Sequence, residues 1–511
     1  MPADRRAFLR AVSVLGLGSI AGCSSPSQPP SSTSPSAPTS MGAQTPTVRP
    51  TSTLTPTPTT TTATPTPTPD ATTTAPTPSP TPTRTPTQTR TPMPTPTPTP
   101  TPSPPPDTSG PAGLARLSAA DADDIDWFGY QVALSADGST ALVGAPRDED
   151  PHGLWGGSAY LFARGDGGWL QGAKLVAEDG GPQDRFGISV ALSADGTTAL
   201  VGADQDENPH GVDGGSAYVF APRDGEWVQR TKLVAWDGGP GDRFGFAVAL
   251  SGDGRRALVG TPQDEDPHGL GAGSAYLFVL RADGWANEAK LAADDGGPED
   301  IFGVSVALSG PGTTALVGAQ GDENPNGERG GSAYVFGRTA GDWTQTAKLA
   351  AADGGPSDRF GHSVALSRDG STAILGAPED ENPNGERGGS AYVFGRDGDS
   401  WAQTTKLVAA DGYPLDYFGS DVALSGDGKT ALVGAFGDDP NGPGSGSSYL
   451  FSRTGATWIQ SAKLVSWDGQ DRTNFGDSTA LSADGRLALV GARTYRNATG
   501  EAVGAVYVFE P

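Results

Sequence analysis

Seven Phe-Gly dipeptides follow one another along this 511-residue chain at an almost constant interval. Successive phenylalanines of these pairs are 58 residues apart five times and 57 residues apart once. Such a period is typical of repeat architectures, in which one unit cannot bury its apolar face without its neighbours. The seven phenylalanines are Phe128, Phe186, Phe244, Phe302, Phe360, Phe418 and Phe475.

Each unit contains four short apolar runs separated by turn residues, which predicts four β-strands. The segment Ser193–Thr197 reads Ser-Ala-Asp-Gly-Thr and predicts a tight two-residue hairpin turn, since Asp-Gly tolerates the positive φ that such turns require. Helix-length periodicity is absent from these runs. Four antiparallel strands in a unit of this size are the signature of a β-propeller blade, so we expect an all-β fold.

The two ends of the repeat region are truncated in a complementary way. Residues 115–121 align without gaps with residues 347–353, so they form a fourth strand that has no blade of its own. The last unit stops after its third apolar run, residues 505–509. We therefore expect the N-terminal strand to complete the last blade and to close residues 111–511 into a seven-bladed β-propeller, which hides two sheet edges.

The repeated motif resembles a known family. Phe128-Gly129 is followed by Val-Gly-Ala-Pro at residues 143–146, and Phe360-Gly361 by Leu-Gly-Ala-Pro at residues 375–378. These pairs resemble the FG-GAP repeats that build the seven-bladed head of integrin α-chains and many microbial surface proteins. The resemblance covers about residues 114–511, and it implies an extracellular propeller whose loops bind other molecules.

The resemblance also implies calcium, because many FG-GAP blades carry a loop of alternating carboxylates between their first two strands. In this chain that position holds a short turn with one carboxylate, as at Asp137-Gly138, Asp195-Gly196 and Asp253-Gly254. Calcium takes about six to eight oxygen ligands. We therefore do not expect the family's calcium site here, and no other cofactor is indicated.

Carboxylates gather instead one loop later, before a Pro-His-Gly or Pro-Asn-Gly turn. They are candidate metal ligands, although we favour the interpretation that they are solvated turns. The candidates are Asp148, Glu149, Asp150, Asp206, Glu207, Asp264, Glu265, Asp266, Asp322, Glu323, Asp380 and Glu381, with Asp438 and Asp439 at the same place in the sixth unit.

Two further residue types, histidine and tryptophan, recur at fixed positions and are candidates for a metal site and for sugar binding. His152, His210 and His268 share one loop position, which Asn326, Asn384 and Asn441 occupy elsewhere, so tolerance of a tight backbone explains the position better than a shared metal. Six tryptophans recur on the fourth strand, where packing between blades explains them better than sugar stacking. They are Trp169, Trp227, Trp285, Trp343, Trp401 and Trp458.

The sequence offers few residues that could act in catalysis. The only other histidine is His362, and no nucleophile–base motif is visible. Only the final unit departs notably from the repeat, at residues 493–500, where no cluster of carboxylates or histidines is added. We expect a protein that is not an enzyme.

The N-terminus has the features of an export signal. Arg5 and Arg6 precede Phe8-Leu9 and an apolar run over residues 11–21. This run is shorter than the roughly 20 apolar residues that a membrane span needs. The paired arginines resemble a twin-arginine export signal.

The export signal ends at a candidate lipidation site. Residues 20–23, Ile-Ala-Gly-Cys, resemble a bacterial-type lipobox, and Cys23 is the only cysteine of the chain. We expect residues 1–23 to be the signal peptide and Cys23 to carry lipid, although an ordinary signal with a chance cysteine is the alternative. In an exported protein Asn497-Ala498-Thr499 is also an acceptor sequence for N-glycosylation.

Residues 24–110 consist almost entirely of Ser, Thr, Pro and Ala. They have too few apolar side chains to pack, and alternating Thr-Pro favours extended polyproline II. We expect a low-complexity stalk that holds the propeller away from the outer face of the membrane.

The charge of the chain excludes some partners. The formal net charge is −25, and residues 1–110 carry six arginines and three aspartates, so the remainder carries −28. Such a surface repels nucleic acid and anionic lipid. Only seven lysines occur, six of them at one repeated position, and this composition resembles that of proteins from extreme halophiles.

These features together favour a lipid-anchored adhesion or ligand-binding module outside the cell. Its expected partners are the membrane, through the lipid, and an envelope protein or glycan. A structural component of the cell envelope is the alternative, and a propeller enzyme acting on glycans or phosphoesters is less favoured.

Overall fold

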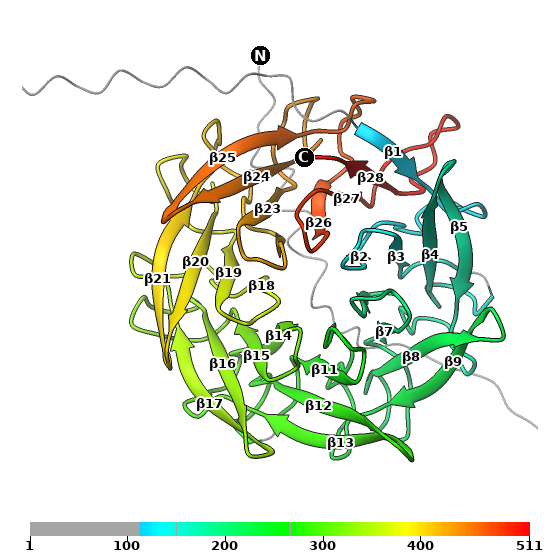
Figure 1. Cartoon of the computed structure of the whole chain (residues 1–511), viewed down its shortest axis with the longest axis horizontal. Coiled ribbons are helices and arrows are strands. Elements are labelled where there is room, and N and C mark those ends of the chain that lie inside the picture. The colour runs from blue at the N-terminus through cyan, green and yellow to red at the C-terminus, as the bar shows by residue number, and fades with distance from the viewer. Residues whose placement is uncertain (1–112, 150, 266) are drawn as a thin grey trace, which may run out of the picture. The chain divides into compact units, whose positions relative to one another are not determined.

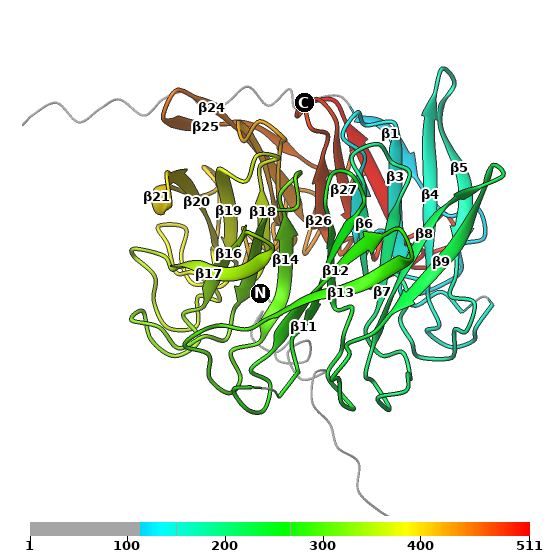
Figure 2. The same cartoon turned by 60° about the horizontal axis from the view of Figure 1, so that its bottom comes forward.

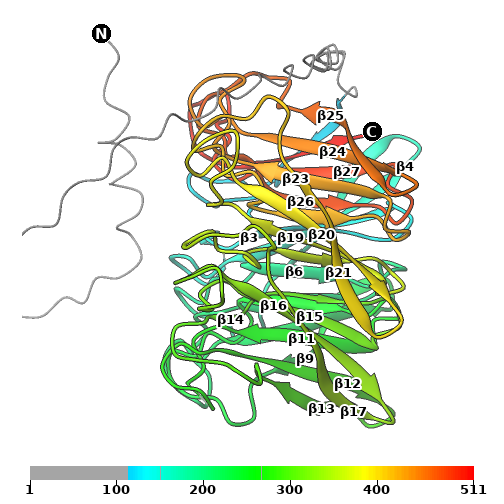
Figure 3. The same ribbon diagram turned by 90° about the vertical axis from the view of Figure 1, so that its left-hand side faces the viewer.

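The computed structural model describes residues 113–149, 151–265 and 267–511. These residues form seven four-stranded antiparallel sheets around a common axis, as Figure 1 shows. The turned views of Figures 2 and 3 show the same ring from other sides. The described ranges contain no helix, and so none with the length and apolar character that a membrane crossing needs. The predicted all-β, seven-bladed propeller is confirmed.

Six blades each contain four strands that are consecutive in sequence. They are β2 (Val132–Leu134), β3 (Thr140–Ala145), β4 (Ser158–Gly165) and β5 (Gly168–Leu175); β6 (Ser189–Leu192), β7 (Ala199–Ala203), β8 (Ser216–Arg223) and β9 (Glu226–Leu233); β10 (Ala247–Leu250), β11 (Arg256–Thr261), β12 (Ser274–Arg281) and β13 (Gly284–Leu291); β14 (Phe302–Leu308), β15 (Thr314–Ala319), β16 (Ser332–Thr339) and β17 (Asp342–Leu349); β18 (Val364–Leu366), β19 (Thr372–Ala377), β20 (Ser390–Asp397) and β21 (Ser400–Leu407); and β22 (Val422–Leu424), β23 (Thr430–Ala435), β24 (Ser447–Thr454) and β25 (Thr457–Leu464).

The seventh blade joins the two ends of the repeat region. It contains β26 (Phe475–Leu481), β27 (Ala488–Ala492), β28 (Ala505–Phe509) and β1 (Gly113–Leu117). The first strand runs antiparallel to the last, with Ala115 opposite Val508 and Leu117 opposite Val506. This pairing confirms the closure that the complementary truncations predict, and Figure 1 shows β1 beside β28.

The inner hairpin of each blade is fixed by its own side chains. In the second blade Gly196 carries the positive φ, +67°, and the six residues 193–198, rather than two, join the paired strands. The Ser193 hydroxyl accepts the N–H groups of Thr197 and Thr198 and donates to the carboxylate of Asp195. The single carboxylate of this turn is therefore used to hold the turn itself.

The same turns join all seven blades around the axis. The residue after the turn serine donates its backbone N–H to the equivalent carbonyl of the next blade, over 2.8–3.0 Å, until the ring closes. Seven such hydrogen bonds tie each inner hairpin to both neighbours. They link, in order, Ala136, Ala194, Gly252, Gly310, Arg368, Gly426, Ala483 and again Ala136.

The glycines of the repeated motif allow close contact between blades. A Cβ atom on Gly144 of β3 would lie 2.0 Å from the carbonyl oxygen of Gly187 in the second blade. Gly187 itself has a φ of +91° and donates its N–H to Gly202 within its own blade. Both glycines of the motif are required for steric reasons, because a side chain at either would push adjacent blades apart.

The hydrophobic core consists of seven clusters, one between each pair of neighbouring blades. Between the fourth and fifth blades Phe360 packs edge-on against Tyr392 and Phe394, with ring centroids 5.4 and 5.9 Å apart. Trp401 of β21 packs against the same cluster. This placement confirms that the recurring tryptophans serve packing between blades.

Candidate functional site

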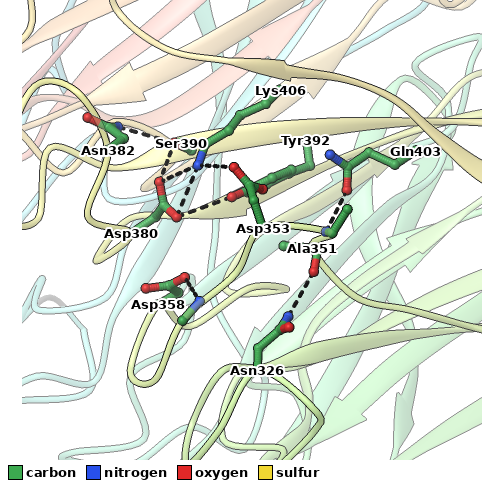
Figure 4. Close-up of polar contacts among 12 residues, drawn as sticks. Asn326, Ala351, Asp353, Asp358, Asp380, Asn382, Ser390, Tyr392, Gln403 and Lys406 are labelled. Atoms are coloured by element: carbon green, nitrogen blue, oxygen red, sulfur yellow. Dashed lines mark hydrogen bonds and ion pairs between the residues drawn. The ribbon is translucent and has the colours of Figure 1, made fainter. Parts of the chain in front are cut away.

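A polar cluster built on a lysine recurs in six blades, and Figure 4 shows it in the fifth. The ammonium group of Lys406, on β21, lies 2.9 Å from Asp353 and 3.0 Å from Asp380. Asp380 also accepts hydrogen bonds from the hydroxyls of Tyr392 and Ser390, over 3.1 and 2.6 Å. We call this arrangement the lysine node. It joins the loop that enters the blade to the loop between the second and third strands.

The charges of the node stabilise one another. Burial opposes ionisation of Lys406, but its hydrogen bonds to Asp353 and Asp380 raise its pKa above the ordinary value. Burial likewise opposes the charge on Asp353, yet Lys406 holds the pKa of that carboxyl below its usual range. Burial, then the charge of Asp380, raises the pKa of Tyr392, so its hydroxyl stays protonated and donates.

Five other blades contain the same pair of ion pairs over 2.7–3.0 Å. The lysines and their two aspartates are Lys174 with Asp121 and Asp148, Lys232 with Asp179 and Asp206, Lys290 with Asp237 and Asp264, Lys348 with Asp295 and Asp322, and Lys463 with Asp411 and Asp438.

A second group of side chains lies at the inner ends of the loops on the same face. Trp127 and Tyr130, just before β2, stack in parallel with centroids 5.7 Å apart. The guanidinium carbon of Arg147, in the β3–β4 loop, lies 3.3 Å from the centroid of the Trp127 ring and 4.7 Å from that of Trp155. Arg493, which follows β27, lies 5.2 Å from Trp127. Loops of two neighbouring blades therefore meet here.

Two of the arginines in this group have carboxylate partners. Arg493 lies 3.0 Å from Asp477, and Arg185, just before β6, lies 3.4 Å from the fully buried Asp204. Arg147 forms no ion pair within the described residues. Burial, then the charges of Arg185 and Arg493, lowers the pKa of Arg147. We call this group the rim cluster: Trp127, Tyr130, Arg147, Trp155, Arg185 and Arg493.

The backbone that presents the rim cluster is strained. The residue before each of the seven phenylalanines adopts a positive φ of 52–59°, a region that favours glycine. None of the seven is glycine, so bulky side chains are kept at this position despite the strain. They are Trp127, Arg185, Arg243, Ile301, Arg359, Tyr417 and Asn474.

A family model described as the FG-GAP repeat matches seven segments of the chain. The segments are 113–162, 169–220, 227–278, 285–336, 343–394, 401–451 and 458–509. The chain belongs to the FG-GAP repeat family. Each matched segment starts in the outer strand of one blade and ends in the third strand of the next, so every FG-GAP repeat links two blades. No curated protein matches the chain in sequence.

The acidic loops of the FG-GAP repeats differ from the solvated turns that we favoured. The first carboxylate of each loop is a buried member of a lysine node, and only the second is exposed to solvent, as for Asp380 and Glu381. The buried carboxylates are Asp148, Asp206, Asp264, Asp322, Asp380 and Asp438, and the exposed ones are Glu149, Glu207, Glu265, Glu323, Glu381 and Asp439. Asp150 and Asp266 lie outside the described residues.

A hollow of about 440 Å³ in the fifth blade is lined by Asp353, Asp358, Asp380, Glu381 and Arg387, among others. Lys406 already lies between two of these carboxylates. Within the described part of the chain, no three His, Cys, Asp or Glu side chains are grouped so that they could hold a metal ion.

The His/Asn position of the loop has a different explanation from the tight backbone that we expected. The side-chain amide of Asn326 donates to the carbonyl of Ala351 over 2.8 Å, and Asn384 donates to Ala409 over 2.9 Å (Figure 4 shows the first bond). The rings of His152 and His268 lie against the equivalent inter-blade segments, beside Gly180 and Gly296. The position therefore joins successive loops. His210 occupies this position in the second blade, where its backbone N–H donates a hydrogen bond to the side-chain oxygen of Asn208.

Four further predicted residues have separate outcomes. Cys23, Arg5 and Arg6 lie outside the described residues. Asn497 lies in the loop between β27 and β28, where its amide donates to Glu501 over 2.8 Å. The rim cluster was not predicted from the sequence, although the last repeat departs from the others at Arg493. Comparing the repeats position by position could have found Arg147, because Gln, Gly, Glu or Thr stands there in the other blades.

Proposed function

We propose that this FG-GAP propeller is a ligand-binding or adhesion module, displayed at the outer face of the cell membrane through lipid on Cys23. Its ligand would be an envelope protein or glycan, and it would bind at the rim cluster. We propose binding without catalysis, since the buried carboxylate of each acidic loop is already paired with a lysine, as Asp380 is with Lys406.

The observation that carries this proposal is the distribution of differences among the repeats. Strands, turns and lysine nodes recur with little change, whereas the residues that follow each Phe-Gly differ in every blade. They are Tyr130, Ile188, Phe246, Val304, His362, Ser420 and Asp477. Tyr130, Phe246, His362 and Asp477 are partly exposed, whereas Ile188, Val304 and Ser420 are buried. Unlike exposed side chains on a nearly symmetric scaffold offer one asymmetric surface, which is what recognition of a single partner requires.

Aromatic side chains and arginine add to this argument. Trp, Tyr and Arg dominate the binding energy of protein interfaces, and the rim cluster contains all three in contact with one another.

Binding of the full-length chain to fractionated cell envelopes and to a glycan array tests the proposal. The double variant Trp127→Ala, Tyr130→Ala should lose binding, whereas Ile459→Ala, which alters a 59% exposed side chain on an outer strand, should keep it. Absence of any ligand for the wild-type protein would contradict the proposal. Crosslinking in intact cells to one abundant neighbour, unaffected by the rim substitutions, would instead support a structural role in the envelope.

A further inference from the structure

We propose that Arg147, which lies against the rings of Trp127 and Trp155, forms an oxyanion-binding subsite that takes a carboxylate or sulfate group of the ligand. This inference deepens the proposed function and rests on it for the identification of the rim as the ligand-binding surface. The chemistry of the subsite itself follows from its geometry and charge.

Stacking on indole rings leaves the edge of a guanidinium group available to a ligand. The guanidinium carbon of Arg147 lies 3.3 Å from the centroid of the Trp127 ring and 4.7 Å from that of the Trp155 ring. The N–H donors of a guanidinium point outward in its own plane, so stacking does not use them. The backbone N–H of Arg147 also donates to the carbonyl of Asp126 over 3.2 Å, which fixes the start of the side chain. The donors are therefore oriented before any ligand arrives.

The local charge favours an anion. Of the three arginines in the rim cluster, Arg185 and Arg493 each have one aspartate partner, whereas Arg147 has none within the described residues. The cluster and its two aspartates together carry one net positive charge, in a chain whose formal charge is −25. A carboxylate or sulfate would offset that charge and relieve the repulsion among the three guanidinium groups.

The shape of the donor group selects among anions. A guanidinium edge presents two parallel N–H groups, which match two oxygens of one carboxylate or sulfate in a bidentate hydrogen-bonded pair. A neutral sugar or a single-point acceptor satisfies only part of this arrangement. The flanking indole rings add an apolar surface on which the body of the ligand can lie.

The other blades provide the test variant. Glutamine occupies the position of Arg147 in the second and third blades, as Gln205 and Gln263, so Arg147→Gln introduces a residue that this loop already accommodates. Arg164→Gln is the matched control, because Arg164 is 40% exposed, pairs only with Glu510 and lies outside the rim cluster. Both variants change the charge of the chain by the same amount.

The experiment is a tryptophan fluorescence titration of the full-length protein at constant ionic strength, since Trp127 and Trp155 flank the subsite. Sodium sulfate and sodium glucuronate are the anionic probes, and glucose is the neutral control. We expect saturable changes with one or both anions in the wild type and Arg164→Gln, and at least about tenfold weaker binding in Arg147→Gln. A response to sulfate alone or to glucuronate alone would identify which oxyanion the subsite takes.

Two results would overturn the inference: equal titrations for the wild type and Arg147→Gln, or an equal response to glucose and glucuronate. Envelope binding separates this inference from the proposed function. If Arg147→Gln binds envelope fractions as the wild type does, the subsite is not a ligand contact, although the proposed function stands. If the anions bind through Arg147 but the wild type binds no envelope component, the oxyanion site stands and the proposed function fails.

Discussion

Arg116 and Asp468 form an ion pair of 2.5 Å across the seam where the ring closes, although 352 residues separate them in sequence. Arg116 takes the place of the node lysine in the seventh blade. There Tyr495 replaces the buried aspartate and accepts a hydrogen bond from the same guanidinium group. The tyrosine of the third strand, Tyr507, donates to Asp468 over 2.6 Å. The closing blade therefore keeps the node but changes two of its residues together.

Deletion of residues 111–120 should destabilise the propeller strongly. The deletion removes β1 with its buried Leu117, takes Arg116 from its node and leaves β28 with an open edge. Loss of one buried leucine alone costs about 2–5 kcal/mol, so the thermal midpoint should fall by about 10 °C or more. Deletion of residues 91–100 is the control and should leave the midpoint unchanged. Equal midpoints for the two deletions would show that β1 does not close the ring.

Lys406→Met should destabilise the protein by about 3 kcal/mol, because it leaves the buried carboxylate of Asp380 without its cation. The Asp380 side chain is only 2% exposed. Lys429→Met is the matched control, since Lys429 is 65% exposed and should contribute less than about 0.5 kcal/mol. Denaturant unfolding measures both. A loss no larger than the control's would mean that the node does not stabilise the blade.

Stability should fall as the pH rises from about 4 to about 7. Burial, then the charge of a neighbouring aspartate, raises the pKa of Asp358 to about 6. The pKa values of four equivalent carboxyls rise likewise: to about 7 at Asp126, Asp184 and Asp416, and to about 6 at Asp300. The folded chain then retains protons that the unfolded chain has released, so folding loses free energy as the pH passes through this window. Burial lowers the pKa of His362 to about 4, which acts in the opposite direction, but only at one group.

Asp358→Asn tests this dependence at one blade. Asparagine can still accept the N–H of Gly355 that Asp358 accepts over 2.5 Å, and it removes the charge beside Asp380. The thermal midpoint should rise by about 2–4 °C at pH 8 and change little at pH 4.5. Asp399→Asn is the control, because the Asp399 side chain is fully exposed. Whatever change it makes in the thermal midpoint should be equal at pH 4.5 and pH 8. A gain for Asp358→Asn that does not depend on pH would contradict the assignment.

Chelation should change the thermal midpoint little in high-salt buffer. Each lysine node places an ammonium group between two carboxylates where a divalent cation would otherwise fit, as with Lys406 between Asp353 and Asp380. An ion present at about 100 times its dissociation constant would contribute about 2.7 kcal/mol per site, so loss from several blades could not be missed. If chelation does cause a large drop, Asp148→Asn together with Asp150→Asn would have to reproduce it for the acidic loops to be the site.

Cys23→Ser should release the protein from the membrane into the medium without lowering its thermal midpoint. A lipid on the only cysteine would be the anchor, and the substitution lies far in sequence from the first propeller strand. Ser24→Ala is the control and should remain in the membrane fraction. Unchanged retention of Cys23→Ser would exclude this anchor.

The periodic sequence determined the fold class, the number of blades and the way the ring closes. A period of 58 residues with four apolar runs permits few arrangements, and the unmatched strand at residues 115–121 has only one free partner, residues 505–509. The same regularity allowed the tryptophans to be assigned to packing. These conclusions depend on local pattern and on counting, which the order of residues specifies directly.

Only the tertiary structure decided how the charges are used. Lys406 is 53 residues from Asp353 and 26 from Asp380, and sequence alone indicates neither contact. Six of the seven lysines each pair with two carboxylates, so the first carboxylate of each acidic loop belongs to an internal ion-pair network rather than to a solvated turn. Arg493 of the seventh blade likewise lies over Trp127 of the first blade only because these two blades pack against each other. Such contacts depend on the closure of the ring, so they cannot be predicted from local sequence.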